Sequence, residues 1–192
     1  VDQLSAVSCE IIAVGRRDLE LGKEGQAARI DVHLGDIRDE HIWENIPKDI
    51  DYVFYLAAQT SVVTAEADPL EDYKVNVLPL IRLLGCLEKV SPNANVIFSG
   101  TVTEVGMPLY LPVNEFHPDS PITVYDKHKL AAEKQLQRFC TKGPINGCTL
   151  RLANVYGPGG SSSSIDRGVL CLMINRALRG KNLKVFGDGK NI

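Results

Sequence analysis

The sequence predicts an α/β fold of the Rossmann-like type, in which a doubly wound parallel sheet is the middle of three layers. Two observations predict it. Short runs rich in β-branched residues alternate with longer segments of helical periodicity, as parallel strands joined by crossover helices require. The run at 51–58 is also almost entirely apolar, which is typical of a strand covered on both faces.

Three strands are expected before the first long helix. The run at 10–15 ends in a glycine, and the run at 28–34 alternates apolar and polar residues before it stops at Gly35. The apolar run at 51–58 is the third. We expect these strands to belong to a parallel sheet.

The first long helix is expected to begin after Asp68. Pro69 then occupies the first helical position and Glu71 the third, which is the arrangement of a capping box. Apolar residues continue at helical spacing beyond this start. Pro79 lies among them, and we expect it to kink the helix or to end its first part.

A second set of elements completes the pattern. A strand at 95–99 leads to a second helix, which we expect to start at Ser120 and Pro121 and to run to about Cys140. Beyond it the sequence predicts a strand at 147–153, a glycine- and serine-rich stretch at 157–164 and a short strand at 183–186. The glycine-rich stretch is either a mobile loop or a crossing toward another domain.

Composition excludes several classes of protein. The 192 residues carry a net charge of −3 with 44% hydrophobic and 23% charged residues, too apolar and too weakly charged for a disordered chain. A slightly acidic chain is also a poor nucleic-acid binder, because phosphates attract a basic surface. No apolar run approaches the roughly 20 residues that span a bilayer, so we expect no membrane association.

The five cysteines are scattered and form no CxxC pair. We therefore expect small buried residues rather than metal ligands or disulfides, and no metal site. The first residues lack the basic and apolar regions of a signal peptide. A reducing, cytoplasmic location is expected.

Tyr125 and Lys129 are the most informative pair. They lie one turn apart on the apolar face expected for the second helix, together with Ile122, Ala132, Leu136 and Phe139. A lysine directed into the interior is costly unless a partner or ligand needs its charge. Its ammonium would lower the pKa of the tyrosine toward neutrality and so make an acid/base pair. The alternative is a chance spacing.

Hydroxyl groups follow the strand at 95–99. Ser99 and Thr101 lie at the carboxyl end of an expected buried parallel strand, where α/β sheets bind ligands. A threonine hydroxyl there can hold a substrate oxygen while the tyrosine exchanges its proton. The alternative is that both side chains cap backbone groups of the loop.

These residues resemble the extended short-chain dehydrogenases/reductases, the sugar-nucleotide epimerase/dehydratase family. The resemblance rests first on Ser99, Gly100 and Thr101, followed at a distance by Tyr125 and Lys129. Further segments resemble the family in the right order, at 35–39, 55–59, 68–77, 150–158 and 185–189.

The resemblance implies a role for each matching residue. Tyr125 would be the general acid/base, Lys129 would hold the nicotinamide ribose, and Thr101 would bind the reacting oxygen. Asn154 would meet the substrate together with Thr101. Further residues would line the cofactor path, with adenine contacts first: Asp36, Ile37, Leu56, Ala57, Ala58, Thr60, Asn76, Ser99 and Leu152. Residues 1–160 would form the NAD(P)-binding domain, and 161–192 would begin the substrate-binding region.

The sequence also departs from the family. The glycine-rich turn of the family is missing, so we expect a sheet that is incomplete at its first strand. Val102 and Thr103 occupy the positions of an Asp-Glu pair in the family's dehydratases, so we expect no 4,6-dehydration. Glu104 is one residue late, and in an extended segment it would point to the opposite face.

Arg16 and Arg17 follow the run at 10–15, where an acidic residue would bind the 2′-hydroxyl of NAD. Guanidinium groups can instead bind a 2′-phosphate, so NADP is slightly favoured over NAD. The alternative is a pair of solvated surface arginines.

The expected function is that of an NAD(P)-dependent nucleotide-sugar oxidoreductase, either an epimerase or a 4-ketoreductase. The expected partner is a nucleotide sugar, and the expected assembly is a homodimer without nucleic acid. Two alternatives remain: a non-catalytic dinucleotide-binding protein that acts through partners, and an inactive fragment. By itself the 192-residue chain is expected to bind a dinucleotide weakly and to show no turnover, because the phosphate-binding glycine-rich turn is missing.

Overall fold

The computed structural model describes residues 4, 6–17, 27–44, 46–155 and 169–183. Five parallel strands form two sheets in this part of the chain. Strands β1 (Glu10–Gly15) and β2 (Arg29–Leu34) make a two-stranded sheet, in which Glu10 pairs with Arg29 and Gly15 with Leu34. The expected parallel α/β arrangement is confirmed.

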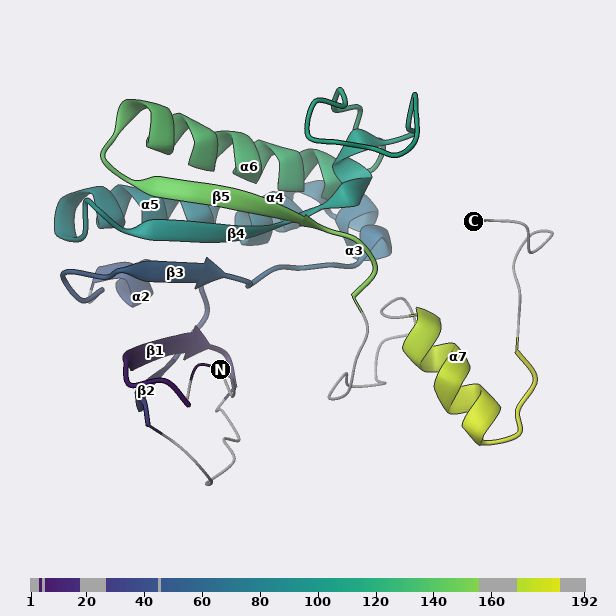
Figure 1. Cartoon of the computed structure of the whole chain (residues 1–192), viewed down its shortest axis with the longest axis horizontal. Helices are drawn as coiled ribbons and strands as arrows, with labels where there is room; N and C mark the ends of the chain where they lie inside the picture. Colours follow the sequence, from purple (N-terminus) through teal and green to yellow (C-terminus); the bar gives the residue numbers. More distant parts are fainter. Residues whose placement is uncertain (1–3, 5, 18–26, 45, 156–168, 184–192) are drawn as a thin grey trace.

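The larger sheet contains β3 (Tyr52–Tyr55), β4 (Asn95–Thr101) and β5 (Asn146–Leu152), in that order. Strand β4 lies in the middle, and all three strands are parallel. The predicted run at 51–58 is a shorter strand than expected, because the chain leaves the sheet after Tyr55. The two sheets lie apart, with β3 at the edge that faces the β1–β2 pair (Figure 1).

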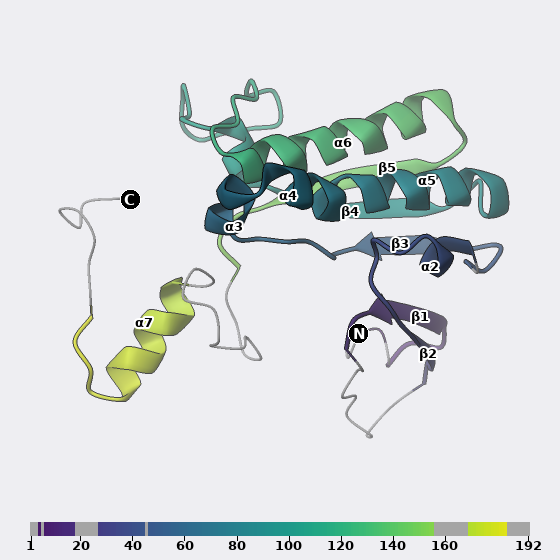
Figure 2. The same cartoon turned by 180° about the vertical axis from the view of Figure 1, so that it is seen from behind.

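Helices cover one face of the larger sheet. They are α4 (Pro69–Asn76), α5 (Leu78–Val90) and α6 (Val124–Lys142), as Figures 1 and 2 show from opposite sides. Val96 and Phe98 point from β4 toward these helices and are fully buried. The core cluster draws its buried residues from β3, β4, the helices and the turns between them, and none from β1 or β2.

Among the described residues, the opposite face of the larger sheet is exposed. Tyr52 and Phe54 of β3 are 63% and 49% exposed, and Leu150 and Leu152 of β5 are 51% and 42% exposed. The sequence predicted helices on both faces, and the described helices pack on one.

Pro79 marks the boundary between two helices, as the sequence predicted. Helix α4 ends at Asn76, and α5 begins at Leu78 with Pro79 in its first turn. The expected N-cap is also present, since the side chain of Asp68 accepts a hydrogen bond from Glu71 N at 3.0 Å. A short helix before it, α3 (Val62–Ala67), was not predicted.

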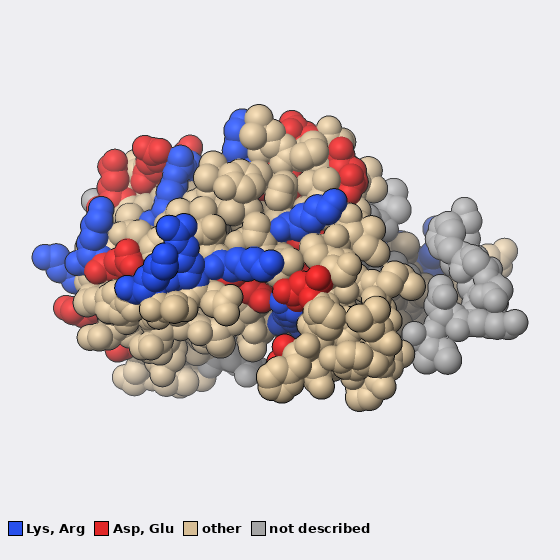
Figure 3. Space-filling model, turned by 90° about the horizontal axis from the view of Figure 1, so that it is seen from above, with Lys and Arg blue, Asp and Glu red and all other residues tan. Residues whose placement is uncertain are grey.

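Helix α6 begins later than expected. The prediction of a start at Ser120 is wrong, because Thr123 is the N-cap and forms a reciprocal capping box with Asp126. Ile122 therefore lies outside the helix and is 60% exposed, whereas Ala132 and Leu136 of the predicted face are buried. The outer side of α6 carries exposed lysine and arginine residues, and Figure 3 shows such side chains among acidic ones.

Residues Val102–Val105 form a short 3-10 helix, η1, at the end of β4. The sequence predicted an extended segment here, and this is wrong because Thr101 and Glu104 make a capping box that closes the turn. Two other helices were not predicted, α2 (His41–Glu44) and α7 (Val169–Leu178).

The predicted glycine-rich stretch at 157–164 lies outside the described residues, as does most of the predicted strand at 183–186. The described helices include none that is both long and apolar enough to span a bilayer.

Candidate functional site

Tyr125 and Lys129 lie in the first two turns of α6, against the end of β4. Lys129 is 2% exposed, and its ammonium lies 4.3 Å from the ring centroid of Phe98, a residue of β4. Such a cation–π contact stabilises a charge that burial otherwise disfavours. Tyr125 is half-buried one turn earlier. The structure thus brings the predicted pair to the carboxyl end of the sheet.

The electrostatics of this pair differ from the prediction. Burial, with the nearby carboxylates of Asp126, Glu104 and Asp72, raises the pKa of Tyr125 to about 12. The expectation of a pKa near neutrality is therefore wrong for this structure, because desolvation and three acids act in the same direction. A tyrosine with this pKa holds its proton, which is the form that donates to a carbonyl oxygen.

Lys129 responds to the same surroundings. Burial lowers its pKa to about 8, although Glu104 and Asp72 act in the opposite direction. The ammonium therefore predominates at pH 7, and about half of it is neutral one pH unit higher. The pair thus comprises a protonated phenol and a readily titrated amine.

Thr101 ends β4, and its side chain is engaged locally. Its Oγ1 lies 2.9 Å from Thr103 Oγ1, which in turn donates to Asp126 Oδ1 at 2.6 Å. These contacts connect the end of β4 to the first turn of α6. Ser99 donates from Oγ to the carbonyl of Tyr55 at 3.1 Å. Thr101 thus caps the backbone of η1, as the alternative interpretation held, since its Oγ1 also accepts a hydrogen bond from Thr103 N. Ser99 bonds instead to the end of the neighbouring strand β3, and a role of either hydroxyl group in ligand binding stays a prediction.

Glu104 lies beneath Thr101 and was not predicted as a site residue. It is completely buried, and its Oε1 accepts a hydrogen bond from Thr101 N at 2.9 Å. Burial is the main cause that raises the pKa of Glu104 to about 7, and nearby Glu133 adds to it. Arg151 Nε lies 3.3 Å from Glu104 Oε2 and partly offsets this. The position of Glu104 after Thr101 was visible in the sequence, whereas the burial of Glu104 depends on η1, a turn that the sequence did not predict.

Arg151 of β5 joins three acids behind the site. It binds Glu133 of α6 through Nε at 3.0 Å and Nη2 at 2.6 Å, and its Nη1 lies 2.7 Å from Asp119. Two-point binding of this kind is directional as well as strong. The cluster fixes β5, α6 and η1 relative to one another.

The predicted cofactor segment follows β3. Leu56 is 67% exposed, Thr60 is exposed, and Ala57 and Ala58 are half-buried. Asn76 is buried and holds this segment from α4: its Oδ1 accepts from Gln59 N at 2.9 Å, and its Nδ2 donates to Gln59 O at 3.0 Å. The side chain of Asn76 therefore positions the segment.

The predicted adenine end lies beyond β1 and β2. Arg38 donates to both carboxylate oxygens of Asp36, at 2.9 Å and 2.7 Å, and it lowers the pKa of that carboxyl to about 2. Arg38 also pairs with Glu71 of α4. Ile37 packs against the core, and Trp43 Nε1 donates to its carbonyl at 3.0 Å.

Arg16 and Arg17 are exposed directly after β1. Gly35 N donates to Gly15 O at 2.9 Å, so the ends of β1 and β2 stay paired beside these arginines. Leu152 and Asn154 lie at and beyond the end of β5, both exposed. Nearly all predicted site residues thus lie at the carboxyl ends of strands, where α/β sheets bind ligands. The described residues contain no cluster of metal-binding side chains.

Comparison with known proteins agrees with this arrangement. The NAD dependent epimerase/dehydratase family matches residues 1–192. A putative UDP-glucose 4-epimerase of Methanocaldococcus jannaschii is 33% identical over 155 residues, which cover 80% of this chain and 50% of that protein. The chain thus spans about half the length of this curated relative.

Two solved structures extend the similarity to the fold. The UDP-glucose 4-epimerase of Thermotoga maritima, solved with UDP-glucose, has a TM-score of 0.83 and 30% identity, covering 98% of this chain and 62% of that one. MoeE5 in complex with UDP-glucose and NAD has a TM-score of 0.81 and 25% identity, and the match covers 97% of this chain and 59% of that one.

Proposed function

The chain belongs to the NAD dependent epimerase/dehydratase family, and from that premise we propose that it supplies the NAD(P)-binding and proton-transfer part of a nucleotide-sugar epimerase. The single observation that carries the proposal is the position of Tyr125 and Lys129 beside the end of β4. The relatives support the choice of reaction, since UDP-glucose 4-epimerases occur among both the curated and the solved ones.

The candidate residues fit a dinucleotide. Exposed turns follow β1 and β3, and an extended ligand would lie along the carboxyl ends of the strands. Asp36 and Ile37 would hold the adenine end, and 56–60 the middle. When bound, the nicotinamide accepts and returns a hydride.

Proton transfer would belong to Tyr125. Its protonated phenol donates to the oxygen of a keto group as a hydride returns to the sugar carbon. In the opposite step the phenolate takes the hydroxyl proton. The surroundings of Tyr125 favour the phenol, so the phenolate needs a positive charge nearby. The ammonium of Lys129 would supply that charge. Thr101 would hold the reacting oxygen, and Asn154 would contact the nucleotide sugar.

The test is Tyr125→Phe in the full-length protein, with Tyr110→Phe as a matched control. Tyr110 is 44% exposed on the loop between η1 and α6, and it has no part in the proposed chemistry. We expect Tyr125→Phe to lower turnover of UDP-glucose by ~10²-fold or more, because a general acid/base is lost. NAD affinity should change little, and Tyr110→Phe should retain activity. Equal turnover by both variants would refute the role of Tyr125.

A 4-ketoreductase that prefers NADP is the second candidate. The exposed guanidinium groups of Arg16 and Arg17 favour it, since Arg16 lies close enough to Asp36 to lower the pKa of that carboxyl. A 2′-phosphate there would meet two cations, and the nearby carboxylate of Asp36 is already paired with Arg38. Preference for NADP would favour a reductase over an epimerase.

Two further expectations belong to this proposal. The whole protein would be a homodimer in a reducing, cytoplasmic compartment. The four described cysteines are free thiols, but the expectation that they are buried is wrong: Cys86 and Cys140 are half-buried, and Cys9 and Cys148 are exposed. A non-catalytic dinucleotide binder would bind NAD as tightly and show no turnover. Loss of turnover specific to Tyr125→Phe separates this alternative from an enzyme.

A further inference from the structure

Asp72 is a buried acid of α4 that lies between two parts of the candidate site. The residue is 2% exposed, and its Oδ1 accepts hydrogen bonds from Gln59 Nε2 at 2.8 Å and Asn76 Nδ2 at 3.0 Å. A buried carboxylate is costly unless donors surround it. His128 of α6 provides a third partner, with Nδ1 at 2.7 Å from Asp72 Oδ2.

His128 is held in one orientation. The proton assignment that satisfies the carboxylate places the hydrogen on Nδ1, which then donates to Asp72. The ring also meets Tyr73 edge-on, with centroids 5.5 Å apart. Along α6, His128 lies three residues after Tyr125 and directly before Lys129. A displacement of His128 would therefore move the turn that carries both.

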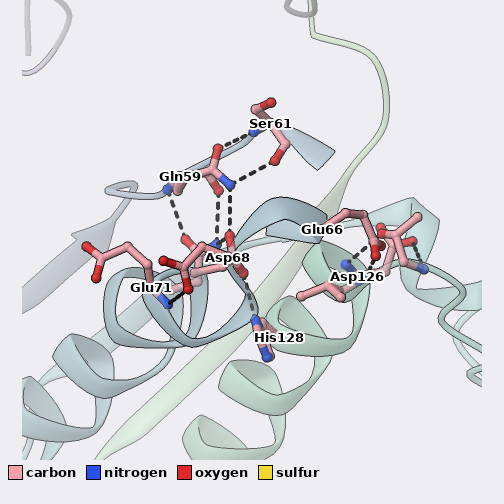
Figure 4. Close-up of polar contacts among 11 residues, drawn as sticks. Gln59, Ser61, Glu66, Asp68, Glu71, Asp126 and His128 are labelled. Carbon is pink, nitrogen blue, oxygen red and sulfur yellow. Dashed lines mark hydrogen bonds and ion pairs between the residues drawn. The ribbon is translucent and has the colours of Figure 1, made fainter. Parts of the chain in front are cut away.

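The same contacts reach the segment after β3. Gln59 donates to Asp72, and its Oε1 accepts a hydrogen bond from Ser61 N. Figure 4 shows this series of bonds from Ser61 through Gln59 to His128. A second contact joins α3 to the first residue of α6, where Glu66 Oε1 accepts from Val124 N at 2.8 Å. Tyr125 thus lies between two contacts of α6, one with Glu66 of α3 and one with Asp72 of α4.

We propose that His128 is a positioning residue, an inference that rests on the proposed function. Through Asp72 and Gln59 it fixes the first turns of α6 relative to the segment that would bind the cofactor. Tyr125 and Lys129 are then held at the distance from the nicotinamide that proton transfer needs. A displacement of about 1 Å at such a site can lower the rate by ~10²-fold.

The experiment compares His128→Leu, His128→Asn and the control His41→Leu, which lies at an exposed position of α2. Leucine removes the donor, whereas asparagine can present an amide hydrogen near the place of Nδ1. We expect His128→Leu to lower kcat with UDP-glucose by ~10-fold or more and to change its KM by less than ~3-fold. His128→Asn should recover most of the rate, and His41→Leu should match the wild type.

Two readouts do not depend on turnover. The first is hydrogen exchange in the cofactor-free protein, where His128→Leu should accelerate exchange at the amides of Gln59 and Ser61. The second is NAD affinity, which His128→Leu should lower about fivefold. In an Asp72→Asn background, His128→Leu should add little to either effect, because the two residues act as one unit. If His128→Leu does not fold, His128→Ser replaces it, since serine is too short to reach Asp72.

Equal kcat and exchange rates in His128→Leu and the wild type would overturn the inference. Equal losses in the leucine and asparagine variants would overturn it too. A wild-type protein that binds NAD and turns over no nucleotide sugar would refute the proposed function but not the role of His128. The exchange rates and NAD affinities of the variants would then still decide the role of His128.

Discussion

Replacing Glu104 by glutamine should remove a pH dependence from the stability of the protein. The folded chain binds the Glu104 proton more tightly than the unfolded chain, since the pKa rises from 4.5 to about 7 on burial. The resulting stabilisation is complete below about pH 4.5 and is lost as the pH rises through about 7. At ~1.4 kcal/mol per pKa unit, this difference corresponds to at most about 3.5 kcal/mol.

Urea denaturation between pH 4.5 and 8 measures the effect. Glutamine keeps an acceptor for Thr101 N and cannot ionise, so the free energy of unfolding of Glu104→Gln should change less over this range than that of the wild type. Glu115→Gln, at an exposed position of the same connecting region, is the matched control and should follow the wild type. Parallel curves for the wild type and Glu104→Gln would refute the reasoning.

Three further predictions concern the cofactor, the core and the turn after η1. Replacing Arg16 and Arg17 by serine should lower the NADP/NAD ratio of kcat/KM, and an unchanged ratio would show that the arginines do not bind the 2′-phosphate. Leu84→Ala, at a fully buried position, should destabilise the protein by ~2–5 kcal/mol in urea denaturation, whereas Leu109→Ala, at a position 76% exposed, should have little effect. Gly106 has φ +65° and an added Cβ would meet the carbonyl of Ser120, so Gly106→Ala should cost ~1–2 kcal/mol or more. Gly85→Ala in α5, where the added Cβ meets nothing, should stabilise by about 0.5–1 kcal/mol, and similar shifts for both glycines would contradict the strain argument.

Much of the fold could be predicted because its elements are defined by local patterns. All five described strands coincide with predicted runs, and Pro79 marks the boundary of α4 and α5. The start of α6 was mispredicted because two N-cap signals lie three residues apart. Thr123 forms the cap with Asp126, whereas Ser120 N donates to Glu104 O and belongs to the preceding loop.

Part of the candidate site could also be predicted from local sequence patterns. Tyr125 and Lys129 share a helical face, so their spacing predicts their proximity. The pKa of Tyr125 depends instead on its burial and on acids from α4, η1 and α6, which no local pattern brings together. The contact of His128 with Asp72 likewise joins residues 56 positions apart. Such contacts become visible only when the helices are packed.

The separation of the β1–β2 pair from the main core bears on how the protein unfolds. Because neither strand contributes to the buried cluster, this pair should open in fluctuations that leave β4 and α6 intact. The ion pairs of Arg38 with Asp36 and Glu71 link the two units across their surface. A dinucleotide with its adenine beyond β2 and its nicotinamide beside α6 would bridge units of unequal stability. Part of its binding energy would then go into closing the weaker unit, so cofactor binding should protect β1 and β2 from exchange more than it protects β4.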